Sequence, residues 1–215
     1  MRRRRRADLV VDRLTLALGG LAAASAVAVV ATELGRVWRR GSAPLPQETD
    51  ALLVAAGEAV VETAQVARVG YQETSPRETA LFNLFSAFVL TFLIARAVTY
   101  RLRHRGIWGP LRNFYVGRRH VHHFVPGIAI AFASGAAAIV SRDEELGAKL
   151  AVPFGIGMGL TFDESALLLE LEDVYWQREG VLSVQITLAA SSLLAALALG
   201  LRFLRRGEQV VLENP

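Results

Sequence analysis

The apolar residues of this 215-residue chain are concentrated in five runs that polar segments separate. Each run is about 17–22 residues long, the length that a helix needs to cross the hydrocarbon layer of a bilayer. We therefore predict an all-α fold, a transmembrane helical bundle of about five spans that forms a single membrane domain over residues 1–215. The predicted spans cover about 12–33, 79–100, 124–141, 149–173 and 182–203.

A sixth stretch, about 50–71, has helical periodicity but carries too much charge for a span. Glu58 and Glu62 are four residues apart and share one helical face. Another face carries the apolar residues Leu53, Val60 and Ala64. This pattern predicts an amphipathic helix that lies on the membrane surface or on the bundle.

Two element ends have local signals. Ser75 can cap a helix whose first residue is Pro76, and Glu78 completes a capping box, so the second span should begin here. The last residues, 207–215, follow the fifth run and are expected to form a loose tail.

Arginine distribution predicts the orientation in the membrane. With the N-terminus in the cytoplasm, Arg2–Arg6 and the basic loop 101–119 both lie inside, as the positive-inside rule prefers. The same orientation puts Arg202, Arg205 and Arg206 on the non-cytoplasmic side, which the rule disfavours. We predict a multi-pass protein of the cell membrane with a cytoplasmic N-terminus. Cleavage of the first run as a signal peptide is the alternative, although the run exceeds the usual apolar core of such peptides.

Composition narrows the function classes. The chain has no cysteine, which excludes disulfides, zinc–thiolate sites and cysteine nucleophiles. Its net charge is +4, and Lys149 is the only lysine, an arginine bias that indicates a bacterial genome. The basic residues flank apolar runs, so we expect bilayer lipids and anionic head groups as partners and no nucleic acid. Arg96, Arg118 and Arg119 are the candidates for ion pairs or head-group contacts.

Three histidines precede the third run: His120, His122 and His123. Imidazole nitrogens suit a divalent metal such as Zn or Fe. A helical backbone would pair His120 with His123, and an extended one would pair His120 with His122. Alternatively, these side chains contact lipid phosphate or cap the following helix.

The fourth run carries carboxylates into the membrane. A carboxylate near the bilayer centre costs about 2.5–3.5 kcal/mol on insertion scales, so a partner or a water-filled cavity is expected beside it. Asp163, Glu164 and Glu170 are the catalytic candidates. The candidate metal ligands, from both runs, are His120, His122, His123, Asp163 and Glu170. Alternatively, Arg96 neutralises Asp163 or Glu170 in a buried ion pair, and Gln185 lies at the same depth.

Gly155 and Gly159 form a GxxxG spacing within the fourth run. Small residues let a second helix approach closely, so these two glycines predict tight packing and a possible homo-oligomer. Pro153 could instead kink the helix and release a carbonyl. The glycines are not a nucleotide-binding loop, because a preceding strand and a phosphate-binding lysine are both missing.

The segments Arg118–Gly127 (RRHVHHFVPG), Gly157–Ser165 (GMGLTFDES) and Asp173–Trp176 (DVYW) resemble a group of bacterial polytopic membrane proteins of no known activity. The resemblance covers roughly residues 100–200. It implies that the HxHHxxPG and GxGxxxDES segments belong together, and no more. The chain lacks HExxH and the glutamate, arginine and histidine pattern of membrane CAAX-type proteases.

Three functions fit these patterns. The first is a metal-dependent hydrolase of lipid-type substrates at the cytoplasmic leaflet. The second is a small ion- or proton-coupled transporter that uses Asp163 and Glu164. The third is a structural membrane protein whose charges form internal ion pairs.

Overall fold

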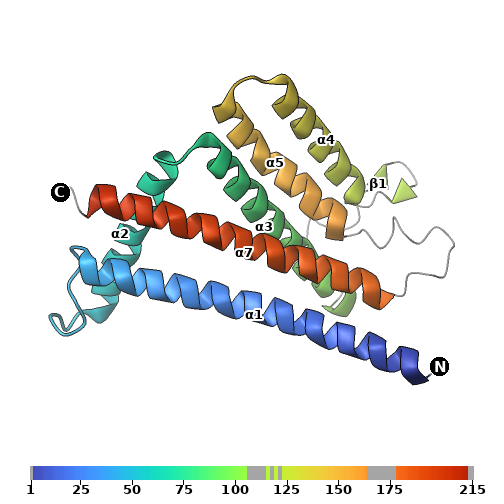
Figure 1. The fold of residues 1–215 in the computed structure, drawn as a ribbon, viewed down its shortest axis with the longest axis horizontal. Helices are drawn as coiled ribbons and strands as arrows, with labels where there is room; N and C mark the ends of the chain where they lie inside the picture. Colours follow the sequence, from blue (N-terminus) through green and yellow to red (C-terminus); the bar gives the residue numbers. More distant parts are fainter. Residues whose placement is uncertain (1, 106–114, 117–118, 121–122, 164–177, 213–215) are drawn as a thin grey trace.

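The computed structural model describes residues 2–105, 115–116, 119–120, 123–163 and 178–212 (Figure 1). Six helices make up nearly all of this part of the chain, and its only strand pairing is two residues long. The elements are α1 (Arg2–Arg40), α2 (Leu52–Gln72), α3 (Pro76–Arg105), β1 (Tyr115–Val116), β2 (Arg119–His120), α4 (Phe124–Val140), α5 (Glu144–Asp163) and α7 (Arg178–Val211). The predicted all-α fold is confirmed for the described residues.

Three of the helices are long and apolar enough to cross a membrane. These stretches are Ala17–Arg40 of α1, Pro76–Val98 of α3 and Gln185–Val211 of α7. The apolar helix α4, Phe124–Val140, is shorter than a span of ordinary length. In water such helices would expose large apolar surfaces, whereas a bilayer solvates them. The chain is therefore a helical membrane protein.

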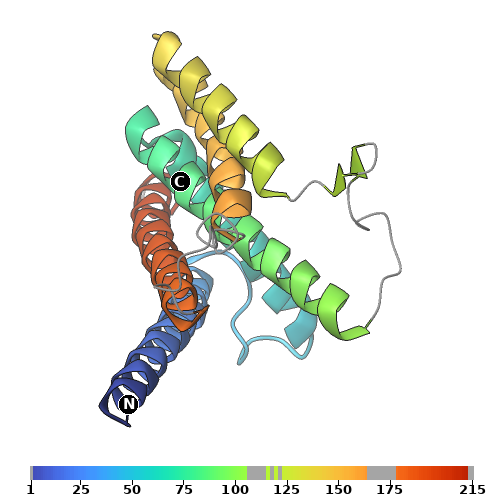
Figure 2. The ribbon, with the colours of Figure 1, turned by 90° about the vertical axis from the view of Figure 1, so that its right-hand side faces the viewer.

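The helix α7 is packed against α1, α2 and α3, as Figure 1 shows. The helix α5 lies between α3 and α4, with which it forms its main contacts. The helix α2 lies across the end of the bundle where α1 ends and α3 begins (Figures 1 and 2). The chain therefore has two packed groups, α1–α2–α7 and α3–α4–α5, that meet where α3 contacts α7.

Glycines set the close packing of α5 on both sides. A Cβ at Gly159 would lie 2.9 Å from the carbonyl oxygen of Phe88 in α3, and Gly155 also faces α3. A Cβ at Gly157 would lie 2.6 Å from the backbone nitrogen of Ala131 in α4. The predicted tight packing is confirmed, and the partner of Gly155 and Gly159 is α3 of the same chain. A homo-oligomer built on these two glycines would have to displace α3.

The contact between α2 and α7 also depends on small residues. A Cβ added to Gly70 would collide with the carbonyl oxygen of Phe203, and one added to Gly207 would collide with that of Val66. The buried face of α2 consists of Ala55, Ala59, Val66 and Gly70. The apolar residues that the sequence pattern put on one face, Leu53, Val60 and Ala64, are all exposed. Size, rather than hydrophobicity alone, decides which face packs, because a membrane solvates large apolar side chains.

Some of the predicted helix boundaries agree with the structure and others differ. The helix α3 begins at Pro76 as expected, with Ser75 Oγ 3.4 Å from the backbone nitrogen of Glu78. The fourth helix begins at Glu144 instead of 149, continues through Pro153, and is described to Asp163; the remaining predicted part, 164–173, lies outside the described residues. The predicted loose tail is wrong for its first residues, because α7 continues to Val211.

Candidate functional site

Asp163 is the last residue of α5 and lies at the end of the bundle where α3 ends and α4 begins. Its side chain is only 2% exposed. A carboxylate that is ionised at neutral pH and shielded from water needs cationic or hydrogen-bonding partners. The structure supplies them from three other helices, α3, α4 and α7.

Arg96 of α3 is the cationic partner. Its Nε lies 2.8 Å from Asp163 Oδ1, and its Nη2 donates a hydrogen bond to the Asp163 carbonyl oxygen at 3.2 Å. The short Nε–Oδ1 contact is an ion pair without well-aligned hydrogen-bond geometry, since Oδ1 accepts no such bond from the described residues. The guanidinium carbon also lies 5.4 Å from the centre of the Phe92 ring. Arg96 therefore neutralises Asp163 and fixes the end of α5 to α3.

His123 is the partner from α4, where it occupies the N-cap position. Its Nε2 lies 3.1 Å from Asp163 Oδ2. An ionised carboxylate can only accept, so the Nε2–H donates to Asp163 and, in the neutral ring, the lone pair lies on Nδ1. The imidazole is about one-third exposed, so it is anchored on one edge without being fully enclosed.

Gln185 of α7 completes the cluster and is almost fully buried. Its Oε1 accepts a hydrogen bond of 2.6 Å from Arg96 Nη2. Its Nε2 donates to the carbonyl oxygens of Phe162 and Asp163 at 2.8 and 3.1 Å. Gln185 therefore links α7 to the last described turn of α5 while it orients Arg96. We name Arg96, His123, Asp163 and Gln185 the Asp163 cluster.

This geometry can hold an imidazole in one orientation and one tautomer. Carboxylate–histidine pairs of this kind prepare a histidine to accept a proton or to bind a metal. No group of three or more histidine or carboxylate side chains that could hold a metal is found within the described ranges. The described residues alone thus fit an oriented acid–base histidine and do not make a metal centre.

The structure brings together some of the predicted site residues. Of the alternatives that the sequence left open, the structure shows the ion pair between Arg96 and Asp163, with Gln185 at the same level. His120 and Arg119 belong to β2, which pairs antiparallel with β1 and matches His120 to Tyr115; only their backbone is described. The remaining predicted site residues lie outside the described residues: Arg118, His122, Glu164 and Glu170.

A second charged group at the other end of the bundle was not predicted. Glu208 of α7 is 1% exposed. Its Oε2 lies 2.8 Å from Arg36 and 3.1 Å from Arg40, both of α1. Arg205 contacts Glu33 Oε1 at 2.9 Å and links the two helices again. We name Glu33, Arg36, Arg40, Arg205 and Glu208 the Glu208 cluster; its sequence signal is opposite charges three or four residues apart on α1 and on α7.

Glu78 at the start of α3 pairs with two further arginines of α7. Its two carboxylate oxygens lie 2.9 Å from Arg202 and 3.1 Å from Arg206. The predicted orientation puts three arginines outside the cytoplasm, against the positive-inside rule: Arg202, Arg205 and Arg206. Each of them has a carboxylate partner.

We compared the chain with protein families, with curated proteins and with solved structures, and none of the three comparisons gives a match.

Proposed function

We propose that the chain is a multi-pass protein of the cell membrane with about five spans and a cytoplasmic N-terminus, and that the Asp163 cluster is its functional site. In this proposal His123 is the acid–base group for a lipid-type substrate at the cytoplasmic leaflet. Asp163 and Arg96 position the imidazole. The observation that carries the proposal is the 3.1 Å contact between His123 Nε2 and a buried carboxylate oxygen.

Two arguments support five spans. The helices α1, α3, α4, α5 and α7 all run between the two ends of the bundle, while α2 lies across one end (Figure 1). The helix α5 has 20 residues, which correspond to about 30 Å at the rise of an α-helix. Because α3 and α4 cover it on two sides, α5 needs less apolarity than a helix that faces lipid.

The ion pairs support the orientation. With the N-terminus in the cytoplasm, the arginines at the outer ends of α1 and α7 face the side that the positive-inside rule disfavours. Arg36, Arg202 and Arg205 are each paired with a glutamate there, which lowers their cost. Arg2–Arg6 and the last residues of α3 lie at the opposite end and set the orientation.

A metal ion remains part of the proposal only through side chains that the structure does not describe. A Zn or Fe ion on His123 would need further ligands, for which the sequence offers His120, His122 and Glu170. In the structure both oxygens of Asp163 contact side-chain nitrogens, so we assign Asp163 to positioning His123 rather than to ligation.

A structural role is the second candidate, because four helices converge on Asp163 and its partners would stabilise the bundle even without any reaction. Transport by Asp163 fits the geometry less well, since an ion that binds there would have to displace Arg96.

The test is lipid turnover in vesicles of bacterial polar lipids that contain the full chain, followed by lipid mass spectrometry. We expect a new lipid product with the wild type, and its loss in His123→Gln and Asp163→Asn; His104→Gln is the matched histidine control. If no product forms with any chain while His123→Gln lowers the melting temperature, the site is structural and the enzymatic proposal is wrong.

Metal content of the same samples separates the two forms of the enzyme. About one metal ion per chain, lost in a His120→Ala, His123→Ala double variant, would favour a metal-dependent hydrolase. Product formation in metal-free protein would favour acid–base catalysis by His123 alone.

A further inference from the structure

A large apolar groove lies between α1 and α3, with α7 as its floor and α2 as its end wall. Its volume is about 910 Å³. Apolar side chains of all four helices line it, among them Val30, Ala64, Leu90, Leu93 and Leu197. A water-filled groove of this composition is unfavourable within a membrane, whereas an alkyl chain matches its walls.

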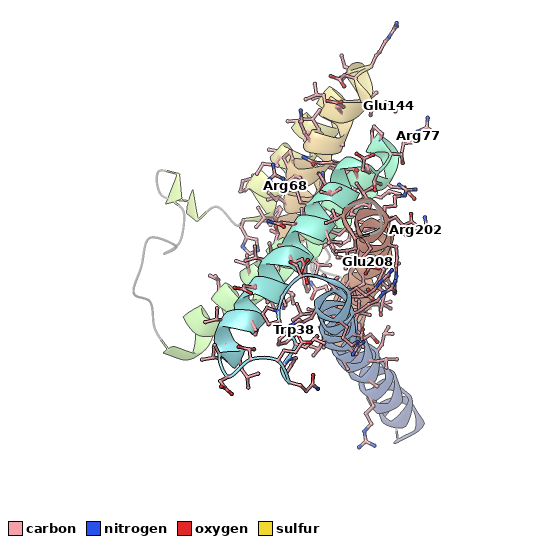
Figure 3. The ribbon with its side chains drawn as sticks, turned by 90° about the vertical axis from the view of Figure 1, so that its left-hand side faces the viewer. Trp38, Arg68, Arg77, Glu144, Arg202 and Glu208 are labelled. Carbon is pink, nitrogen blue, oxygen red and sulfur yellow. The ribbon has the colours of Figure 1, made fainter. Side chains whose placement is uncertain are left out.

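Two charged side chains break the apolar lining. Arg68 of α2 is exposed, and within the described part of the chain it forms no ion pair or hydrogen bond (Figure 3). Glu33 of α1 also lines the groove, although its side chain is more than nine-tenths buried. Its Oε1 binds Arg205, and its Oε2 has no hydrogen-bond partner among the described residues. The groove therefore offers one exposed cation, Arg68, whereas this oxygen of Glu33 is enclosed beneath the lining.

This combination defines the chemistry of an occupant. An alkyl chain fills the apolar part, and a negative group pairs with Arg68. The local charge disfavours a cationic occupant, because Arg36, Arg40 and Arg205 outnumber Glu33 and Glu208 in the adjoining cluster.

We propose that the groove between α1, α2, α3 and α7 binds one anionic phospholipid. The phosphate contacts Arg68, and an acyl chain lies along α7 between α1 and α3. The groove is formed by different side chains from those of the Asp163 cluster, so the proposal stands whether or not that cluster is catalytic.

The test is native mass spectrometry of the full chain in detergent with an equimolar mixture of phosphatidylglycerol and phosphatidylcholine that have the same acyl chains. One interfacial arginine is expected to favour the anionic lipid about fivefold. Arg68→Gln should bring the two one-lipid complexes to similar abundance, and Arg68→Lys should keep the preference. Arg77→Gln is the matched control, because Arg77 is an exposed arginine outside the groove.

A second pair of variants tests the groove itself. Ala64→Trp places a large side chain in the groove from an exposed position and should remove the bound lipid of either kind. Gln65→Trp, on the next residue and outside the lining, should leave binding unchanged. The proposal is overturned if Arg68→Gln keeps the anionic preference, if Ala64→Trp still binds lipid, or if Ala64→Trp dissociates a dimer, which would assign the groove to a second copy.

Discussion

The Asp163 cluster and the Glu208 cluster are both buried charged groups, but they differ in what they contain. The Glu208 cluster consists of arginines and glutamates from α1 and α7 alone. The Asp163 cluster joins four helices and includes a histidine and a glutamine. Arginine and glutamate join helices through ion pairs, whereas an imidazole nitrogen can also accept or donate a proton. One end of the molecule therefore has ion pairs that join α1 to α7, and the other end has a side chain suited to proton transfer.

Removal of Glu208 should have the largest effect on stability. In Glu208→Ala, Arg36 and Arg40 lose their carboxylate, and Arg205 loses a second one. We expect a loss of about 3 kcal/mol in the free energy of unfolding, the low end for a broken buried pair because the arginines are more than one-third exposed. Denaturation in detergent measures it. Lipid turnover per folded chain should stay at the wild-type level; a specific loss of turnover would remove the distinction between the clusters.

Asp163→Asn should lower lipid turnover more strongly than it lowers stability. The amide keeps the shape of the side chain but no longer carries the charge that pairs with Arg96 and holds the Nε2–H of His123. We expect a smaller stability loss, about 2 kcal/mol, together with loss of turnover. The same denaturation and vesicle assays measure both quantities. Full turnover in Asp163→Asn would show that His123 does not depend on this carboxylate.

Gln185→Leu tests the uncharged member of the Asp163 cluster. The substitution leaves two carbonyl oxygens at the end of α5 without their donor and Arg96 without one acceptor. The expected loss is about 1–2 kcal/mol, the cost of an unsatisfied buried polar group. Gln185→Glu serves as the control, because it keeps an acceptor for Arg96 but removes the donor. If neither variant changes stability, the hydrogen bonds of Gln185 to α5 do not stabilise the bundle.

Exposed ion pairs should contribute least to the stability of the bundle. Arg206→Gln removes one of two arginines on Glu78, and Arg202 remains. Arg77 and Glu144 are 3.9 Å apart and both largely exposed, so Arg77→Gln should leave the melting temperature unchanged. We expect the effect of Arg206→Gln to lie between that of Arg77→Gln and that of Gln185→Leu. A shift as large as that of Glu208→Ala would mean that Glu78 is shielded by the membrane.

Local signals in the sequence predicted several features of the fold. The third apolar run, 124–141, matches α4, and Ser75 correctly places the start of α3. The Arg96–Asp163 pair was one of the alternatives expected, because an acidic residue inside an apolar helix requires a partner and Arg96 lies at the matching depth.

Features that depend on how helices cross were not predicted. Periodicity gives a helix its faces but does not choose between them, so the pattern left open whether the Leu53 face of α2 contacts the membrane or the bundle, and it did not identify the small-residue face that packs on α7. Arg36 and Glu208 are 172 positions apart, and nothing local pairs them. Spacing alone also could not select His123 among the three histidines, because that choice depends on where α4 begins relative to Asp163.

The most direct test of the account is the tautomer of His123, measured by ¹⁵N NMR of histidine-labelled chain in lipid, with His123→Gln used to assign its signals. For the neutral ring we predict the proton on Nε2 in the wild type and a mixture of tautomers in Asp163→Asn. A ring in the wild type with its proton on Nδ1, or one that Asp163→Asn does not change, would contradict the claim that Asp163 orients His123.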